Sequence, residues 1–288
     1  MKLATFRLAG RRFVGVVSYD GASVAALSFT ADERGALAMV EYLVAGRPLP
    51  EVTSPALALS AVQLEAPIPR PRRNVFCVGR NYRAHAQELK GSVFKADEKP
   101  LDQWPIIFSK VPETVIAPGA AIRLPGAAAS EQIDYEAELA VVIGRGGQNI
   151  AARDAMAHVW GYTIINDVTA RDVQLRHAQW HLGKSFDSFC PMGPWLVSAD
   201  EIDGRNVRVR CWVNNELRQD APTSDLIFGI PTLVETISRG ITLYPGDLIA
   251  TGTPAGVGMG FDPPRWLRRG DRVRIEIEGI GALENPVT

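Results

Sequence analysis

The stretch from Asp134 to Gly144 (DYEAELAVVIG) holds acidic residues at a spacing that suits metal chemistry. Its pattern predicts a β-strand that begins acidic and ends apolar. Because alternate strand side chains share a face, Asp134, Glu136 and Glu138 would point the same way. Two such carboxylates can converge on a hard divalent cation. The alternative is an edge strand whose acidic face meets water, and the stretch alone favours that alternative.

A further carboxylate follows the next predicted buried strand, Val159–Asn166. Asp167 comes directly after that strand, where a side chain can reach into a site. It is a candidate third metal ligand. The alternative is an N-cap for the segment that follows, a role that Asp often fills.

His85 and Glu88 form a second candidate pair. Asn81 is a suitable N-cap, so the residues after it are predicted to form a short helix, on which positions three apart are neighbours. A carboxylate beside an imidazole orients the ring and raises its basicity, as a general base requires. The alternative is a surface pair without a role, which the pair alone favours.

Lys184 lies in a stretch rich in glycine, proline and aromatic residues, from Leu182 to Trp195. A lysine near a metal-bound substrate would stabilise a developing negative charge. From this residue alone, a surface ammonium is the favoured alternative. Downstream, Thr251–Gly258 (TGTPAGVG) follows a predicted strand, and its backbone N–H groups and hydroxyls can serve an anion.

The elements that must position these residues are mostly strands. Lys2–Leu8 and Arg12–Tyr19 predict a hairpin, and Arg34–Ala45 predicts a helix. The proline-rich connector at 66–73 is expected to be extended. We therefore expect a small N-terminal β-plus-helix domain at 1–66 and a catalytic domain at 67–288. The second domain lacks repeated βα units, which argues against a Rossmann fold or a TIM barrel and favours a β-rich α+β fold.

Composition narrows the functional class. The 288 residues carry 31 Lys and Arg against 32 Asp and Glu, a formal net charge of −1. This balance gives no electrostatic footprint for nucleic acid or an anionic membrane. There is no signal-peptide pattern or membrane-length apolar run, and three unclustered cysteines predict reduced thiols in a cytoplasmic protein.

Five stretches together resemble the fumarylacetoacetate hydrolase family, and their order along the chain also matches. The resemblance covers about residues 70–288, and the small N-terminal domain is similar to that of bacterial members. The stretches are Gly79–Glu88 (GRNYRAHAQE), Asp134–Gly144, Asn166–Gln174 (NDVTARDVQ), Gly183–Pro194 (GKSFDSFCPMGP) and Gly252–Gly258 (GTPAGVG).

The resemblance implies a rolled, mixed β-sheet (a β-roll or sandwich), usually in a homodimer. It implies Mg²⁺ or Mn²⁺ bound by three carboxylates, which by position are Glu136, Glu138 and Asp167. Oxygen-only ligands also suit these ions better than Zn²⁺. This reverses the preference that the acidic stretch has when taken alone.

The resemblance also assigns roles around a small 2-oxo acid substrate. His85 and Glu88 match a dyad that activates water, and Lys184 matches a lysine that supports the oxyanion or enolate. The residues that fall at substrate-contact positions are Arg80, Tyr162, Gln174 and Thr253.

The function that we expect is hydrolysis of a C–C bond in an acylpyruvate or 2,4-dioxo acid, including 2,4-dioxo-3-deoxy sugar acids. The dyad favours hydrolysis, because isomerase and hydratase members often lack it. Alternatives on the same metal site are an oxaloacetate-type decarboxylase and a hydroxymuconate-type isomerase. A non-catalytic 2-oxo acid binding protein is the alternative from another class. The polar segment Lys90–Asp102 is expected to act as a lid.

Overall fold

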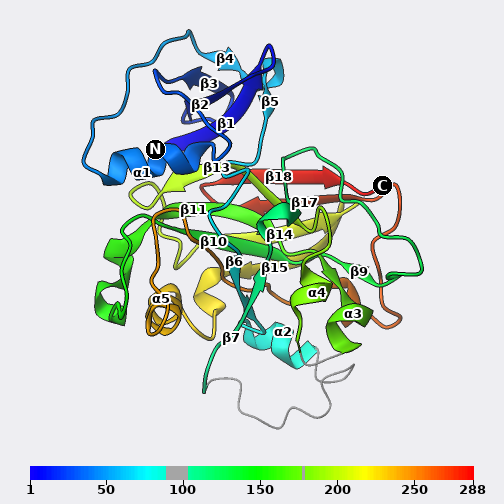
Figure 1. The fold of residues 1–288 in the computed structure, drawn as a ribbon. Helices are drawn as coiled ribbons and strands as arrows, with labels where there is room; N and C mark the ends of the chain where they lie inside the picture. The colour runs from blue at the N-terminus through cyan, green and yellow to red at the C-terminus, as the bar shows by residue number, and fades with distance from the viewer. Residues whose placement is uncertain (89–102, 177–178) are drawn as a thin grey trace.

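A mixed sheet of twelve strands runs through both the N-terminal part and the rest of the chain (Figure 1). The structure is a computed structural model that describes residues 1–88, 103–176 and 179–288. In spatial order the strands are β4 (Leu57–Ala58), β3 (Ser23–Ala26), β2 (Arg11–Val17), β1 (Lys2–Leu8), β13 (Cys190–Ser198), β11 (Val159–Asn166), β10 (Ala137–Ile143), β16 (Leu248–Ala250), β6 (Val75–Gly79) and β7 (Ile106–Lys110), with β5 (Gln63–Leu64) on β1 and β8 (Val115–Ile116) on β13.

Two smaller sheets complete the β-structure. The four-stranded antiparallel sheet has the order β15 (Glu216–Pro222), β14 (Arg208–Val213), β17 (Arg272–Ile277) and β18 (Gly281–Pro286), and the two-stranded one pairs β12 (Thr169–Ala170) with β9 (Ile133–Asp134). Apolar residues of β10 and of the four-stranded sheet share one core, including Leu139, Val141, Val209 and Ile275. This packing confirms a sheet-rich α+β fold.

The helices are short. The α-helices are α1 (Ala36–Val44), α2 (Arg83–Glu88), α3 (Arg171–Arg176), α4 (His181–Lys184) and α5 (Ile230–Ser238), and the 3₁₀ turns are η1 (Leu59–Ala61), η3 (Pro112–Thr114), η4 (Ala152–His158), η5 (Thr223–Asp225) and η6 (Gly258–Gly260). Helices α2, α3 and α4 lie near one another, at the end of the molecule away from β1–β5 (Figure 1). Among the described residues, no helix has the length and apolar character to cross a membrane.

Strand β10 is the central element that carries the site. All seven of its residues are buried, which explains its continuous apolar run after Glu138. It pairs antiparallel with β11, with Ala137 opposite Asn166, and with β16 on its other side. The Asp167 N–H extends this pairing by donating to the Glu136 carbonyl at 2.8 Å. The register therefore brings the Glu136 and Asp167 positions side by side.

The alternation of the acidic stretch predicts one continuous strand, but the structure divides the stretch between two strands. Asp134 belongs to β9, which pairs with β12, whereas β10 begins at Ala137. The break at Tyr135 and Glu136 arises because the two halves pair with different partners. Asp134 and Glu136 thus do not share the face of a single strand.

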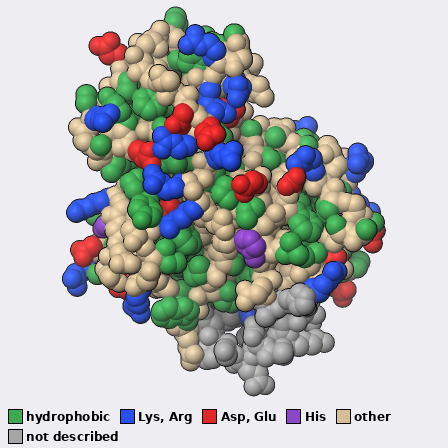
Figure 2. Space-filling model, in the orientation of Figure 1, with side chains coloured by type: hydrophobic (Ala, Val, Ile, Leu, Met, Phe, Trp, Pro, Cys, Tyr) green, Lys and Arg blue, Asp and Glu red, His purple; other side chains and the backbone are tan. Residues whose placement is uncertain are grey.

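The N-terminal strands join the rest of the chain through hydrogen bonds. Strand β1 pairs with β13, with Lys2 opposite Val197, so the predicted small domain extends the central sheet. The boundary at residue 66 stays a prediction. The segment predicted to act as a lid, 90–102, lies entirely outside the described residues. On the face drawn in Figure 2, basic and acidic side chains of the described residues are interspersed.

Candidate active site

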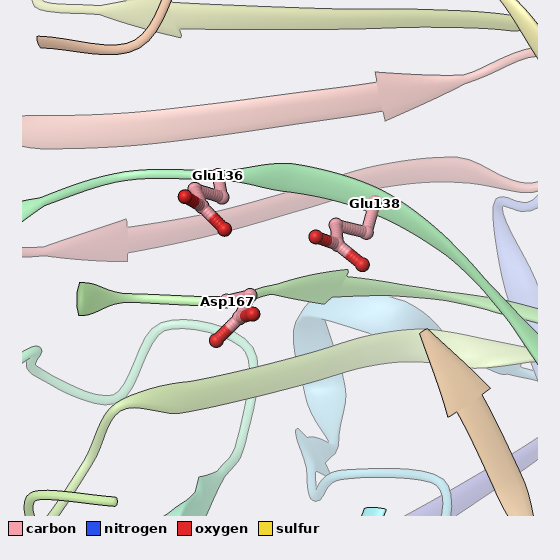
Figure 3. A group of neighbouring side chains, drawn as sticks. All are labelled: Glu136, Glu138 and Asp167. Atoms are coloured by element: carbon pink, nitrogen blue, oxygen red, sulfur yellow. The ribbon is translucent and has the colours of Figure 1, made fainter. Parts of the chain in front are cut away.

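Three buried carboxylates meet where β10 begins and β11 ends. Glu136, Glu138 and Asp167 each offer an oxygen within 4.8 Å of the others (Figure 3). Their exposed fractions are 5%, 1% and 0%. Buried anions this close repel one another and lose hydration, so the cluster requires cations.

Three cationic side chains surround the cluster. Lys184 donates to Oε2 of Glu136 at 2.7 Å and to Oδ2 of Asp167 at 2.8 Å. Lys110 donates to Oδ1 of Asp167 at 2.7 Å. An Arg171 guanidinium nitrogen lies 2.7 Å from Oε1 of Glu136. All three side chains are almost completely buried.

These charges move the pKa values of the two glutamates in opposite directions. Burial opposes ionisation of Glu136, but Lys184 and then Arg171 outweigh it and lower the pKa of Glu136 to about 2. Burial, followed by the charges of Asp167 and Glu136, raises the pKa of Glu138 well above 4.5. The pKa of Lys184 is raised. Burial lowers it, but the charges of Asp167 and Glu136 raise it by more.

The cluster fits a hard divalent cation. Its donors are carboxylate oxygens alone, the ligands that Mg²⁺ and Mn²⁺ prefer. With Asp134 included, four buried carboxylates face three buried cations, which leaves one unbalanced negative charge. A dication would turn this into one positive charge, which suits an anionic substrate. The charged groups counted are Asp134, Glu136, Glu138, Asp167, Lys110, Arg171 and Lys184.

The His85–Glu88 pair forms as the sequence predicts, on α2. Nδ1 of His85 lies 3.2 Å from Oε2 of Glu88. The other carboxylate oxygen of Glu88 accepts the Gly256 N–H at 2.9 Å. His85 is only 3% exposed. The glycine-rich loop thus fixes the carboxylate that orients the imidazole.

The same loop supports the carboxylate cluster. The Gly252 N–H donates to Oε2 of Glu138 at 2.8 Å. The Thr253 hydroxyl donates to the Ala137 carbonyl at 3.0 Å and accepts from the Gln219 amide at 2.7 Å. Because its one proton is committed to Ala137, Thr253 has only acceptor capacity left for a ligand.

One small cavity is lined by two of the carboxylates, Glu136 and Glu138, and by His85 of the dyad, but not by Asp167 or Glu88. Its volume is about 20 Å³, room for about one water or ion. Its lining includes seven of the ten residues predicted to form the site. The lining residues are Val78, Gly79, Arg80, His85, Phe108, Glu136, Glu138, Arg171, Gln174, Trp180, Lys184 and Thr253.

Arg80 and Gln174 lie in this lining, as the resemblance implies for substrate contacts. Arg80 has a φ of 54°, in the left-handed region that non-glycine residues seldom adopt and that is common at functional sites. The Gln174 carbonyl oxygen accepts from Arg171 at 3.1 Å. Its amide N–H₂ group is therefore the part suited to contact a ligand oxygen.

Tyr162 is the predicted contact that the structure does not bring to the cavity. It lies on β11 opposite Val141 and Val197. Its ring packs against Gly204, where a Cβ would come within 2.3 Å of the ring. The strand turns this side chain to the far side of the sheet from the carboxylates, so sequence position alone is misleading here.

Several residues of the site are not among those that the sequence predicts. Lys110, Arg171 and Gln219 are all buried, but each meets its partners through contacts distant along the chain. Asp134, for which the sequence indicates no role, accepts from Arg171 at 2.8 Å and from the Gly258 and Met259 N–H groups. It anchors Arg171 and the glycine-rich loop. For Arg171, the one signal in the sequence is its place in Asn166–Gln174, a stretch that carries the family resemblance.

The sequence model described as fumarylacetoacetate (FAA) hydrolase C-terminal matches residues 74–288. The chain belongs to the fumarylacetoacetate hydrolase family. It is 49% identical to the oxaloacetate tautomerase YisK of Bacillus subtilis (strain 168) over 244 residues. This alignment covers 84% of this chain and 79% of that protein. It is 44% identical over 236 residues to the human mitochondrial oxaloacetate tautomerase FAHD2A, covering 81% and 72%.

Two solved structures are similar to this chain along its whole length. A fumarylacetoacetate hydrolase from Exiguobacterium antarcticum is 39% identical, with a TM-score of 0.84 and coverage of 100% of this chain and 99% of that one. A 5-carboxymethyl-2-hydroxymuconate delta-isomerase from Mycobacterium smegmatis is 35% identical, with a TM-score of 0.79 and the same coverage. The protein is thus an enzyme of this family, whose members use a divalent metal, and its buried acidic triad is suited to hold one.

Proposed function

We propose that this protein is a metal-dependent tautomerase that interconverts the enol and keto forms of oxaloacetate or a similar 2-oxo dicarboxylic acid. One observation carries the proposal: the imidazole of His85 and the carboxylates Glu136 and Glu138 line the same buried cavity. Enolisation needs a base beside a carbonyl group that is held and polarised. The names of the relatives, oxaloacetate tautomerases among them, support this choice over hydrolysis.

A dication at the carboxylates, Mg²⁺ or Mn²⁺, would hold the substrate's carboxylate and 2-oxo group and act as a Lewis acid on the carbonyl. His85 would move the proton at the carbon next to that carbonyl. Because Nδ1 faces Glu88, Nε2 is the ring nitrogen suited to the transfer. Glu88, fixed by Gly256, keeps the imidazole in one orientation and stabilises its protonated form.

Lys184 supplies positive charge where the enolate oxygen develops. Its ammonium is buried and lines the cavity, so its field is little screened by water. Arg171 holds Glu136 and also Gln174, whose amide would donate to the substrate. A bound dication, together with Arg80 and Lys184 in the cavity lining, would favour an anionic substrate over a neutral one.

The hydrolysis expected from the sequence is the second candidate. The observation in its favour is the intact His85–Glu88 pair, which is equally suited to activate a water molecule. Decarboxylation of oxaloacetate passes through a similar enolate, so it belongs with the first candidate as a side reaction.

The experiment compares the rates of three reactions, on oxaloacetate and on acylpyruvates, with Mg²⁺ and again with excess chelator. We expect metal-dependent loss of the enol absorbance of freshly dissolved oxaloacetate, well above the spontaneous rate. We expect much slower cleavage of acylpyruvates and much slower release of pyruvate from oxaloacetate. Acylpyruvate cleavage faster than tautomerisation would favour the second candidate and reject the first.

A further inference from the structure

Lys110, at the end of β7, is a buried lysine that does not line the cavity. Its side chain has no exposed surface. The ammonium donates to Oδ1 of Asp167 at 2.7 Å, to the Val168 carbonyl at 3.1 Å and to the Lys184 carbonyl. All three of its protons are thus used on the outer side of the carboxylate cluster.

Each of the three cluster carboxylates has one oxygen held by a protein donor. Lys110 holds Oδ1 of Asp167. Arg171 lies 2.7 Å from Oε1 of Glu136, and the Gly252 N–H holds Oε2 of Glu138. One oxygen of each carboxylate remains for a cation: Oδ2 of Asp167, Oε2 of Glu136 and Oε1 of Glu138.

The first two of these oxygens share the Lys184 ammonium, at 2.8 and 2.7 Å. This ammonium therefore lies where a cation bound to Asp167 and Glu136 would lie. A metal ion bound there would displace the Lys184 ammonium, whereas Lys110 contacts the other oxygen of Asp167 and could stay. Lys110 thus holds Oδ1 of Asp167, whereas Lys184 contacts Oδ2, the oxygen that remains for a metal.

We infer that Lys110 is a positioning residue that limits Asp167 to one-oxygen ligation and so makes the site select small six-coordinate dications over Ca²⁺. The inference rests on the metal site of the proposed function, but not on the reaction. Ca²⁺ takes six to eight oxygens and often binds a carboxylate through both, whereas Mg²⁺ requires near-octahedral geometry. Three single oxygens leave three octahedral positions, two for a chelating 2-oxo acid and one for water.

Lys110 is well suited to this task because it cannot easily leave. An ammonium separated from its carboxylate in this buried place would be an uncompensated buried charge, which is strongly destabilising. Its bond to the Lys184 carbonyl also fixes the end of α4. Rotation of Asp167 to offer both oxygens to a metal would break the contact with Lys110.

The first test uses the wild-type protein without substrate. Mn²⁺ is added, and the water molecules bound to it are counted from the ¹⁷O broadening of its EPR spectrum. Three bound waters are expected, since three of six positions go to protein oxygens. Two bound waters would overturn the inference, because Asp167 would then bind through both oxygens. A complete lack of Mn²⁺ binding would reject the metal site itself.

The second test compares the dissociation constants of Mn²⁺ and Ca²⁺ by calorimetry. In Lys110→Met, Mn²⁺ affinity should fall about tenfold or more, as for other losses of an outer partner. Ca²⁺ affinity should stay level or rise, and one fewer water should remain on Mn²⁺. Equal losses for both ions would show a general structural role and would contradict the inference.

The matched control is Arg73→Met. Arg73 pairs with the buried carboxylate of Asp247, away from the site, so its removal also leaves a buried anion without its partner. The control should lower the melting temperature but keep the wild-type ratio of Mn²⁺ to Ca²⁺ affinity. Lys110→Arg, which keeps the charge, should retain more of that ratio than Lys110→Met. If neither Lys110 variant folds, the wild-type water count decides the matter.

Discussion

The ammonium of Lys184 lies 2.8 Å from Oδ2 of Asp167, and both side chains are buried. The same nitrogen reaches Oε2 of Glu136 at 2.7 Å. A lysine thus bridges two of the three carboxylates that we assign to a metal. The contact holds the cluster together without a metal, and it makes Lys184 the group that a metal must move.

Lys184→Met should separate the two roles of this lysine. Without the ammonium, a dication has no competitor at Asp167 and Glu136, so Mn²⁺ should bind at least as tightly as in the wild type. Turnover should fall by about 10²–10³, because the positive charge on the enolate is lost. Calorimetry with Mn²⁺ and steady-state rates measure the two effects. Loss of Mn²⁺ binding would instead mean that the ammonium is required to assemble the site.

The His85–Glu88 pair should matter for proton transfer and little for metal binding. His85→Gln should lower kcat by about 10²–10⁴, with a smaller loss for Glu88→Gln. His158→Gln is the control, since His158 is partly buried, does not line the cavity and has its Nδ1 2.7 Å from the Arg145 carbonyl. Full activity in His85→Gln would remove the imidazole from the mechanism.

Gly260 gives an indirect way to disturb the dyad. A Cβ at this position would lie 2.1 Å from Oε1 of Glu88, which the Gly256 N–H already holds. Gly260→Ala should therefore displace the carboxylate and reduce kcat about as much as Glu88→Gln does, with Mn²⁺ affinity unchanged. Gly126→Ala is the matched control, because a Cβ there meets nothing within 4 Å. If Gly260→Ala has wild-type kcat, Glu88 does not need its present position.

Much of this site can be predicted from the sequence, because its most informative residues are close together in the chain. Glu136 and Glu138 share a face two residues apart, and His85 and Glu88 are one helical turn apart. The resemblance then adds Asp167. The metal, the homodimer and the roles of these residues remain predictions.

The contacts that complete the site are not local, and the sequence does not reveal them. In the sequence, Lys110 is an ordinary lysine at the end of a strand, yet its partner Asp167 is 57 residues away. Lys184 reads as a surface ammonium when taken alone, yet it is 1% exposed. Tyr162 is the opposite case. The resemblance suggests that it contacts the substrate, but its side chain lies on the face of β11 that points away from the carboxylates.

In the fold, as in the site, local patterns are predictable from the sequence and contacts between distant residues are not. The predicted helix 34–45 is confirmed as α1 (Ala36–Val44), because it has a local amphipathic pattern and a clear end. The sequence also favours helices over 151–158 and 173–180. The first segment forms the 3₁₀ turn η4 (Ala152–His158), and the second overlaps α3 (Arg171–Arg176) but lies partly outside the described residues. The join of β1 to β13 pairs residues almost 200 positions apart, which no local pattern encodes.

Glu65 gives a prediction for the pH dependence of stability. It pairs with Arg7 and Arg12, and although burial opposes ionisation, these two arginines lower the pKa of Glu65 below 4.5. A lowered folded pKa stabilises the protein above pH 4.5, and this contribution is lost as the pH falls through the folded pKa. Glu65→Gln should cost on the order of 1 kcal/mol of unfolding free energy at pH 7, and progressively less below pH 4.5.

Urea unfolding of both proteins between pH 7 and pH 3 measures this difference. Glu33→Gln is the control, since Glu33 is exposed and its ion pair with Arg70 is long, at 4.0 Å. It should change the free energy of unfolding little at any pH. A difference between wild type and Glu65→Gln that grows toward acid would contradict the assignment.

The most direct test of the proposed function follows oxaloacetate by NMR in real time, with Mg²⁺ and the wild-type enzyme. The enol, the keto form and pyruvate are quantified in the same sample, so tautomerisation and C–C cleavage are compared at one enzyme concentration. We predict rapid metal-dependent conversion of enol to keto form, little pyruvate, and loss of the acceleration in His85→Gln. Pyruvate formation that keeps pace with loss of the enol, or an enol signal that decays at the spontaneous rate, would contradict the account.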